Sequence, residues 1–543
     1  MNAGLTTAPA AGIDDQHRQV LTVLRPRLIG AQLEAALGLT CRAPAGGAPA
    51  GTPQRRVLDA KYRPGEHCTI LYQLGDALVV GTLQWGEAAM AEAVAEVAGA
   101  GGLPADDRRP TTDDRRRTGD GGRETAAYCL LTGEAGRSGG AMRAYLFPDD
   151  PALPGLATAL RPEAMAQALA QNLAACRMGA ARVLRCRVSP VRYRPDKRCT
   201  LRVDVWLRDA RTGTSTPQTL FGKVYHDLQK AAAVYRAMQA LADAAPVRDG
   251  RLAVPRAVAL VPQLPMVLQE AVEGTPLDLF LGPVAVAGTP ADPRGRDGLA
   301  RAARALAALH TVDLPGGRPR PMAAELATLG QRAAQIALVD RALGGRTGEL
   351  LTALAAWSER LPAGRAETGL IHGDCKPSQF LLGAARVALL DLDHCGVGDP
   401  AADVGTFLAT LRQMGIRGTL DRRGRSRPSD RWRGGSPGPA AAAARGRSLQ
   451  ELAEQFLAEY CAASGRGPDF RPRVAWHEAV ALIRKAQRAF ARSPRSPLPA
   501  ALVEGAWHCY ATSATLSGAD RAAGRRGRLG NMVAQGTRRA LAP

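Results

Sequence analysis

The residues of this chain best suited to chemistry stand in the segment 370–405, where acidic residues alternate with short apolar runs. Asp374 follows one apolar run in a turn, and Asp391 ends a second run. A turn at 383–386 between two short strands would place both carboxylates at one end of a β-hairpin. Two carboxylates so placed suit phosphoryl transfer, because one can accept the proton of an attacking hydroxyl while the other holds Mg²⁺ against phosphates.

Lysine is scarce in this sequence, so each lysine is informative. Of the 71 Lys and Arg residues only six are lysine, a bias that suggests a GC-rich coding sequence. Lys376 stands two residues after Asp374, and Lys223 stands in the apolar strand-like run TLFGKVY. We expect these two side chains to lie where phosphate groups need positive charge.

The formal net charge of +21 would ordinarily point to a nucleic acid or an anionic membrane as partner. Thirteen of these charges fall in two segments, 417–447 with nine Arg and two Asp, and 521–543 with six Arg and no acidic residue. Both segments are rich in Gly, Pro, Ser and Ala, which is typical of solvated disorder. We therefore predict a basic insert and a basic tail, and nucleic-acid binding by them is a less favoured alternative.

The ten cysteines form no CxxC pair and no metal-type spacing with histidine, so we expect reduced thiols that are mostly buried. The first residues lack a basic segment followed by an apolar one, and no window offers 18 apolar residues without charge. We predict a soluble, cytoplasmic protein without a membrane partner.

An internal repeat precedes the acidic segment. Residues 56–69 and 187–200, at an offset of 131, are identical at seven of 14 positions, including Tyr-Arg-Pro and Cys-Thr. Each copy leads into an alternating apolar strand, which predicts a duplicated β-unit. The second copy continues to Gly222-Lys223, whereas the first continues to Gly81-Thr82 and has no lysine. We expect the second copy to have kept chemistry and the first to have become structural.

The acidic segment resembles the catalytic and metal-binding loops of the protein-kinase-like fold, through His372-x-Asp374-x-Lys376-Pro377-x-Gln379 and Asp391-Leu392-Asp393. Gly373, the run Gly398-Asp399-Pro400-x-x-Asp403 and Leu306–His310 are similar to the aminoglycoside phosphotransferase and choline kinase branch. The resemblance covers residues 185–515. Residues 1–180 are related to the family only through the internal repeat. It implies an α+β bilobal fold with an antiparallel β small lobe, a mostly helical large lobe, and an N-terminal α+β unit resembling a duplicated small lobe.

The same resemblance implies an enzyme that transfers the γ-phosphoryl group of ATP, with Mg²⁺, to a hydroxyl of a small molecule. The acceptor would be sugar-like, aminoglycoside-like or an amino-alcohol, bound between Asp374 and the helices of 449–515. Asp374 would be the catalytic base and Lys376 would meet the γ-phosphate. Asp391 and Gln379 would hold Mg²⁺. The oligomeric state is left open.

The remaining implied roles concern the nucleotide. Lys223 would meet the α- and β-phosphates, and the segment 194–198 would take the place of the phosphate-covering loop. Arg194 and Lys197 are its candidate phosphate contacts. The hinge that holds adenine would be formed by Gln269, Glu270 and Val272. His372 and Asp403 would brace the catalytic loop.

These motifs divide the chain into five expected parts: a loose segment and helix at 1–40, an α+β unit at 41–180, a small lobe at 181–270, a large lobe at 271–520 with the insert 417–447, and the tail 521–543. The local patterns predict a helix at 17–38, a break at 104–125, a helix at 162–178, a helix at 227–243 with Asp227 as its N-cap, and a loop insert at 283–297.

Three departures from the family pattern keep a second hypothesis open. Gln379 stands where Asn is usual, and the segment 194–198 lacks glycine. The helix at 227–242 has no Glu to pair with Lys223, so Gln229, Gln239 or Asp243 would have to substitute. The missing Glu, Gln379 and the duplicated unit without an equivalent of Lys223 make a pseudokinase or nucleotide-sensing scaffold the alternative from another class.

Overall fold

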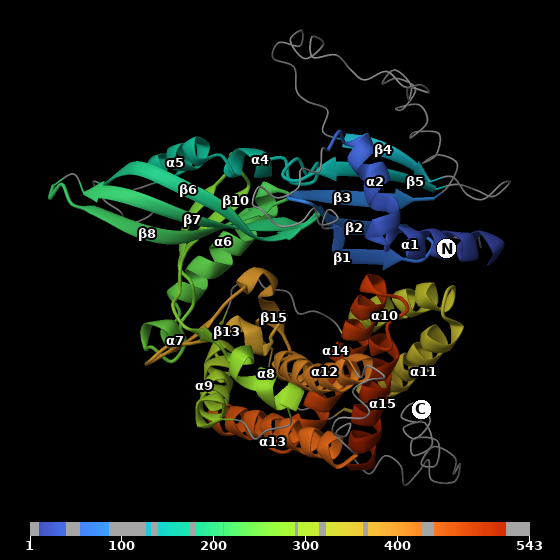
Figure 1. The fold of residues 1–543 in the computed structure, drawn as a ribbon. Coiled ribbons are helices and arrows are strands. Elements are labelled where there is room, and N and C mark those ends of the chain that lie inside the picture. Colours follow the sequence, from blue (N-terminus) through green and yellow to red (C-terminus); the bar gives the residue numbers. More distant parts are fainter. Residues whose placement is uncertain are drawn as a thin grey trace, which may run out of the picture.

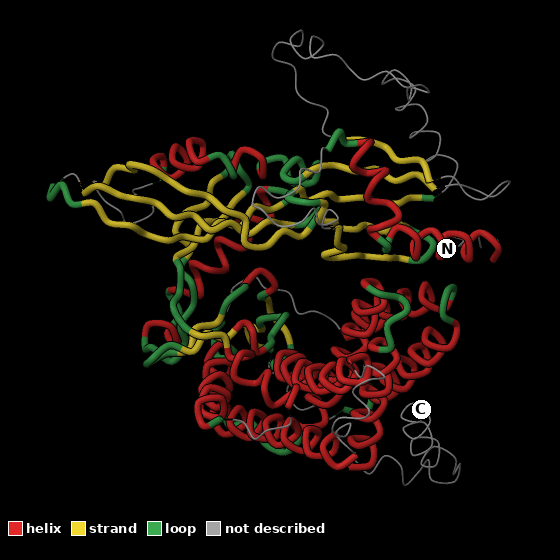
Figure 2. Tube along the Cα trace, viewed as in Figure 1, coloured by secondary structure: helices red, strands yellow, loops and turns green. Residues whose placement is uncertain are grey.

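The computed structural model describes residues 10–39, 55–85, 126–131, 140–172, 181–209, 211–287, 292–313, 322–361, 368–425 and 439–516. Two antiparallel sheets lie next to each other above a helical lobe (Figures 1 and 2). The predicted break at 104–125 and the predicted tail at 521–543 lie outside the described residues. No helix in the described ranges is both long enough and apolar enough to span a membrane.

The front sheet has the strand order β1-β2-β3-β5-β4. Its strands are β1 (Arg55–Arg63), β2 (His67–Leu74), β3 (Ala77–Gln84), β4 (Ala126–Leu131) and β5 (Gly140–Leu146). Two helices pack on it, α1 (Ala10–Val23) and α2 (Pro26–Ala36), and the Tyr72 hydroxyl donates to the Val23 carbonyl at 2.8 Å. The predicted single helix at 17–38 is thus two helices, because Pro26 lacks the N–H that a continuous helix needs there and instead starts the second one.

The second sheet has the order β6-β7-β8-β10-β9, which is the same connectivity as in the front sheet. Its strands are β6 (Ala181–Arg194), β7 (Arg198–Asp209), β8 (Ser215–Tyr225), β9 (Ala257–Val261) and β10 (Met266–Glu270). The short helices α4 (Leu156–Ala159) and α5 (Pro162–Gln171) cover one face of it (Figure 1). The fold-class prediction of a duplicated small lobe is therefore confirmed by topology.

The two copies also match at the level of single side chains. Gly81 pairs with Ile70 in the front sheet, and Gly222 pairs with Leu201 in the second. A Cβ on Gly81 would lie 2.8 Å from the sulfur of Met142, and one on Gly222 would lie 2.9 Å from the sulfur of Met266. Both glycines thus accommodate the same close approach of a methionine from the neighbouring strand.

This register shows which residue has replaced the lysine. Thr82 pairs with Thr69 in the front sheet, just as Lys223 pairs with Thr200 in the second sheet. The front unit therefore carries a neutral hydroxyl where the second sheet carries its ammonium group.

Helix α6 (Leu228–Ala242) covers the face of the second sheet that looks toward the large lobe (Figure 1). As predicted, Asp227 is its N-cap, with its carboxylate accepting from Lys230 N at 2.6 Å. Helix α7 (Ala245–Arg248) follows before the chain returns to β9.

The large lobe is mostly helical. Its helices are α8 (Leu277–Ala287), α9 (Pro293–Leu309), α10 (Met322–Ala337), α11 (Arg341–Ser358), α12 (Ala401–Arg425), α13 (Pro439–Ser464), α14 (Phe470–Arg492) and α15 (Leu498–Leu516). Its short strands are β11 (Thr275–Pro276), β12 (Gly369–Ile371), β13 (Phe380–Leu382), β14 (Val387–Leu389) and β15 (Gly396–Gly398). The predicted hairpin is confirmed, with Phe380 paired to Leu389.

Two predicted inserts are shorter than expected. Helix α8 continues through Pro283 to Ala287 and α9 begins at Pro293, so most of 283–297 is helical. Helices α12 and α13 likewise extend into the basic segment 417–447, of which 426–438 lie outside the described residues. Arg and Ala are good helix formers, which explains why charge alone misplaced these boundaries.

The front unit shares an apolar core with the C-terminal helices. Tyr62 of β1 stacks on Phe490 of α14 with ring centroids 6.2 Å apart, and both side chains are buried. The same core joins Ile70 of the front sheet to Leu329 of α10 and Trp476 of α14. The front unit is thus packed over the large lobe as well as beside the second sheet (Figure 1).

Candidate active site

The loop that carries Asp374 is braced by a buried carboxylate. Gly373 has φ +77°, and a Cβ on it would lie 2.5 Å from the carbonyl oxygen of His394, so only glycine fits this turn. Asp403, at the start of α12, accepts from the backbone N–H of His372 and, at 2.8 Å, of Gly373. These contacts fix the backbone immediately before Asp374.

Two histidines complete the brace. His310 Nε2 lies 3.2 Å from Asp403 Oδ2, and its Nδ1 lies 2.7 Å from the Tyr460 hydroxyl. His372 Nε2 donates to the Leu390 carbonyl at 2.7 Å, which ties the loop to the residue before Asp391. Burial would raise the pKa of Asp403, but the bond to His310 and the backbone donors outweigh it and hold that pKa below its ordinary value. The bracing geometry expected for His372 and Asp403 is present.

Asp374 and Lys376 form an ion pair within this loop. Burial alone would raise the pKa of the Asp374 carboxyl, but the charge and hydrogen bond of Lys376 outweigh it and lower that pKa. Asp374 is therefore ionised at neutral pH and can accept a proton.

Asp391 is surrounded by donors from three elements. Its carboxylate accepts from Lys223 Nζ of β8 at 2.9 Å, from Gln379 Nε2 at 3.2 Å and from Arg198 of β7 at 3.1 Å. Its own φ of +61° is uncommon for a residue other than glycine and aims the side chain at these groups. Burial is outweighed by Lys223 and Arg198, so the pKa of Asp391 is held well below its ordinary range. Two lobes thus meet at this carboxylate.

The partner of Lys223 is not the one expected from the sequence. Lys223 Nζ donates to Asp393 Oδ1 at 2.7 Å, in addition to Asp391. Gln239 instead donates to the Tyr235 hydroxyl at 2.8 Å and lies 3.4 Å from the Ala257 carbonyl. The ion pair usual between a strand lysine and the following helix is replaced here by a carboxylate two residues beyond Asp391.

Sequence reasoning also missed two cations of this site. Arg198 makes an ion pair with Asp393 as well as with Asp391. Lys230, in the first turn of α6, donates to the Asp393 carbonyl at 3.0 Å. The scarcity of lysine could have identified Lys230 as a candidate site residue. The position of Arg198 near the end of the repeat could have identified that arginine in the same way.

The segment 194–198 is the turn between β6 and β7, and the front unit holds it in place. Lys61 Nζ of β1 donates to the Pro195 carbonyl at 2.9 Å, and the Tyr145 hydroxyl of β5 donates to Asp196 Oδ1 at 3.1 Å. Buried Asp150 accepts from Asp196 N at 3.0 Å and from the Tyr193 hydroxyl at 2.7 Å. These bonds stabilise a turn in which Asp196 adopts φ +61° without the help of glycine.

The two candidate phosphate contacts of this turn have different surroundings. Burial, and then the charges of Arg192 and Arg198, lower the pKa of Arg194, while the more weakly acting charges of Asp391 and Asp374 oppose that shift. Burial, and then the positive charges of Lys61, Arg63, Arg194 and Arg488, lower the pKa of Lys197. The structure thus brings Arg194 to the acidic pair and Lys197 to a cationic neighbourhood shared with the front unit.

The candidate hinge residues lie where the second sheet ends. Gln269 and Glu270 close β10, opposite Phe221 and Leu220 of β8, and Val272 lies in the connection to β11. Gln269 is buried, whereas Glu270 and Val272 are half-buried. The chain passes here from the small lobe to the large one.

A further lysine lies on α14 close to Asp374. Lys485 Nζ donates to Thr410 Oγ1 at 2.9 Å and lies 3.4 Å from Gln413 Oε1, both on α12. Burial lowers its pKa to about 7, although the charge of Asp374 opposes that shift. Lys485 is therefore readily neutral, and no sequence motif identified it.

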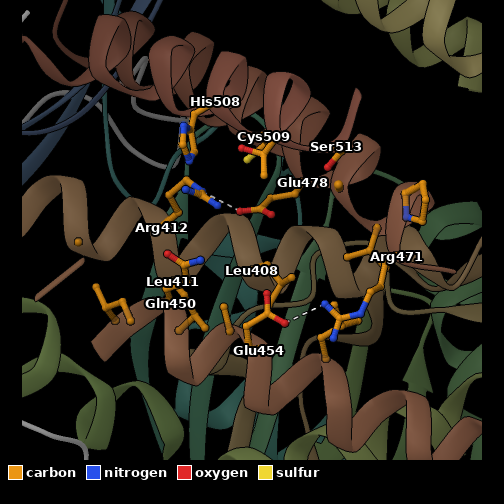
Figure 3. Close-up of a pocket in the computed structure, with 18 of the residues that line it drawn as sticks. Leu408, Leu411, Arg412, Gln450, Glu454, Arg471, Glu478, His508, Cys509 and Ser513 are labelled. Atoms are coloured by element: carbon orange, nitrogen blue, oxygen red, sulfur yellow. Dashed lines mark hydrogen bonds and ion pairs between the residues drawn. The ribbon is translucent and has the colours of Figure 1, made fainter. Parts of the chain in front are cut away.

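A cavity of about 620 Å³ lies elsewhere, between α12, α13, α14 and α15. Two ion pairs flank it, Arg412–Glu478 and Glu454–Arg471, each at 2.8 Å, and His508 and Cys509 of α15 face it (Figure 3). None of the residues assigned above to catalysis, metal or nucleotide lines this cavity. This cavity is therefore distinct from the candidate active site, despite its volume.

A protein-family model matches the part of the chain that carries most of these residues. Residues 203–444 match the model of the phosphotransferase enzyme family. The match includes Lys223, the hinge residues, the catalytic loop and Asp391, and it confirms the resemblance inferred from the motif. None of the curated proteins matches this chain in sequence.

Several solved structures of low sequence identity align with the chain. An aminoglycoside phosphotransferase from Streptomyces rimosus has 20% identity and a TM-score of 0.32, with 57% of this chain and 95% of that chain covered. A choline kinase from Cryptosporidium parvum has 11% identity and a TM-score of 0.36, with 62% and 91% covered. A macrolide 2'-phosphotransferase from Brachybacterium faecium has 18% identity and a TM-score of 0.30, with 61% and 98% covered.

Proposed function

We propose that this protein transfers the γ-phosphoryl group of ATP to a hydroxyl of a small molecule. The observation that carries the proposal is the meeting of Lys223, Asp391 and Gln379 beside the braced, ionised Asp374. Phosphoryl transfer needs groups that position the phosphates, neutralise their charge and orient the attacking hydroxyl, and this arrangement offers all three. The family match over residues 203–444 supports the same reaction class.

Each residue has a proposed part in this reaction. Lys223 and Arg194 bind the phosphates, and backbone groups at Gln269, Glu270 and Val272 hold the base. Asp374 accepts the hydrogen bond of the acceptor hydroxyl and then its proton. Lys376 already lies against Asp374, so it is placed to stabilise charge on the γ-phosphoryl group. Lys197 is placed less directly, because its neighbours are cations.

The residues present fit Mg²⁺. Within the described ranges no group of three or more His, Cys, Asp or Glu side chains could hold a metal ion. Asp391 and Gln379 offer one carboxylate and one amide carbonyl, and Mg²⁺ commonly binds through one or two such groups together with substrate phosphates. When bound there with ATP, it would neutralise charge on the phosphate oxygens. Asp391 and Gln379 would hold it.

The decisive experiment compares the wild type with Asp374→Asn. We expect the variant to bind ATP and Mg²⁺ by calorimetry with a Kd within about threefold of the wild type, since Asn keeps the size and one acceptor of the side chain. Turnover, followed with isotopically labelled ATP and a panel of hydroxyl compounds, should fall at least about 100-fold, because no general base remains. Absence of nucleotide binding in the wild type would refute the proposal.

A nucleotide-binding scaffold without turnover is the second candidate. The observation in its favour is Arg198, which pairs with both Asp391 and Asp393 and so competes with a metal for the same carboxylate. Under this alternative the wild type and Asp374→Asn bind nucleotide equally and neither turns over any acceptor. The same two proteins therefore separate the two functions.

A further inference from the structure

The end of β1 contacts both the small lobe and the large lobe. Lys61 donates to the Pro195 carbonyl of the phosphate-covering turn, and Tyr62 stacks on Phe490 of α14. Arg63, the last residue of β1, follows directly. Lys61 and Tyr62 of the front unit thus contact the small lobe and the large lobe, and the charge of Arg63 acts on Lys197 and on Arg332.

The turn after β1 also contacts α10. Glu66 accepts from Gln335 Nε2 at 2.5 Å, and a Cβ on Gly65 would lie 3.9 Å from Leu338. This turn corresponds in the repeat to the phosphate-covering turn 194–198. The duplicated turn therefore lies against the large lobe, next to the helices where the sequence placed the acceptor.

Cations from four elements gather around these contacts. They are Lys61 and Arg63 on β1, Arg194 and Lys197 in the turn 194–198, Arg332 on α10, and Arg488 on α14; we call these six residues the cationic cluster. Gln487 of α14 donates to the Leu329 carbonyl of α10 at 2.8 Å, so these helices are in contact one residue before Arg488 and one turn before Arg332. Consistently, Arg63 and Arg488 lower the pKa of Arg332 in addition to burial, and Arg488 helps to lower the pKa of Asp374. The cluster therefore extends from the front unit to the proposed catalytic base.

Nearby acidic groups neutralise only a part of this charge. Glu66 pairs with Arg63 at 3.2 Å, and Asp59 pairs with Arg492 at 2.9 Å. Glu325 pairs with Arg484, and Asp196 and Asp150 accept hydrogen bonds from tyrosines. Within the described part of the chain, Lys197, Arg332 and Arg488 form no ion pair, although the charge of Glu66 acts on Arg332. An excess of positive charge thus remains beside Asp374.

We propose that the acceptor is an anion, a hydroxyl compound that carries a phosphate or carboxylate group, and that Arg488 and Arg332 bind this group. The inference rests on the proposed function and narrows its acceptor class. Arginine suits the role because its planar guanidinium binds such oxygens in bidentate fashion. A polycationic acceptor such as an aminoglycoside would be repelled by the same charges.

The test measures anion binding directly. Inorganic phosphate is titrated by calorimetry into protein saturated with Mg²⁺ and a non-hydrolysable ATP analogue, which occupies the phosphate-binding groups of the nucleotide site. We expect millimolar or tighter binding in the wild type and at least about tenfold weaker binding in Arg332→Gln/Arg488→Gln, because two charge-assisted contacts are lost. Arg471→Gln is the matched control, since it removes an arginine of the same helix about 25 Å away along the axis.

Turnover of paired acceptors supplies the second readout. Glucose 6-phosphate and gluconate are compared with glucose and kanamycin, and the anionic compounds should be preferred. Phosphate binding that is absent, or equal in the wild type and the double variant, would overturn the inference, as would a preference for kanamycin. Failure of the ATP analogue to bind would instead overturn the proposed function, so the two failures are distinguishable.

Discussion

At the scale of single residues, the site depends on how burial and neighbouring charge are balanced. Asp374 and Asp391 are both buried enough for their pKa values to rise, yet both are lowered because lysine or arginine lies against them. Lys485 shows the opposite balance, since its hydrogen-bond partners Thr410 and Gln413 are neutral and burial prevails. Burial and neighbouring charge thus keep both aspartates ionised, whereas burial makes Lys485 easy to deprotonate.

Lys485 should impose a pH dependence on stability. Its pKa is about 7 in the folded protein against an ordinary 10.5, so between these values the unfolded chain binds more protons. Stability must therefore rise with pH across that window, by up to about 1.4 kcal/mol per pH unit from this group. Urea unfolding of the wild type and Lys485→Met at pH 7.5, 8.5 and 9.5 measures it. The difference between the two proteins should grow with pH, and parallel profiles would contradict the assignment.

At the scale of elements, the turn 194–198 is held by a neighbouring sheet rather than by glycines of its own. Tyr145, Lys61 and Asp150 belong to the front unit, and each bonds to a residue of the turn or next to it. A turn fixed in this way is preorganised for phosphate, because less conformational freedom is lost on binding. Under the proposed function, the front unit would act on the nucleotide site by holding this turn.

Tyr145→Phe tests this contribution. The change removes only the hydroxyl that donates to Asp196, a bond worth about 1 kcal/mol. We expect the Kd for Mg²⁺–ATP to rise about fivefold, with the midpoint of thermal unfolding nearly unchanged. Tyr235→Phe, whose hydroxyl bonds to Gln239 on α6, is the control. An unchanged Kd in Tyr145→Phe would show that the turn does not need the front unit.

At the scale of the whole molecule, one apolar core joins the front unit to the C-terminal helices. Tyr62 of β1 is 2% exposed and stacks on Phe490 of α14. Its ring is therefore part of the interface between the front unit and the large lobe. Its hydroxyl has no hydrogen-bond partner among the described residues. The ring rather than the hydroxyl should therefore carry the stabilisation.

Two substitutions separate these contributions. Tyr62→Ala should lower the free energy of unfolding by about 3–5 kcal/mol, the usual cost of removing a large buried aromatic side chain. Tyr62→Phe should leave stability equal or slightly higher, because it removes a buried polar group without a partner. Chemical denaturation measures both. A loss above about 1 kcal/mol in Tyr62→Phe would reveal a bond of the hydroxyl in solution.

The sequence by itself determined the local features of this protein. The catalytic hairpin, the cap at Asp227 and the duplicated β-unit depend on short-range patterns, and each lies where the pattern placed it. Helix boundaries were less predictable, as in α8 and α12. A proline or a run of charged residues does not always end a helix that is supported by tertiary packing.

Only the tertiary structure decided which side chains meet. Three sets of contacts join segments that are far apart in the chain. Lys223 pairs with Asp393, Lys61 supports the turn 194–198, and the charges of Arg63 and Arg488 both act on Lys197. No local pattern encodes such contacts, because they depend on how the two sheets and the helical lobe pack. The scarcity of lysine was one sequence-level signal for these contacts, and all six lysines lie on elements or turns around this site. The net charge of +21 indicated a polyanion, but the packing instead places part of it next to Asp374.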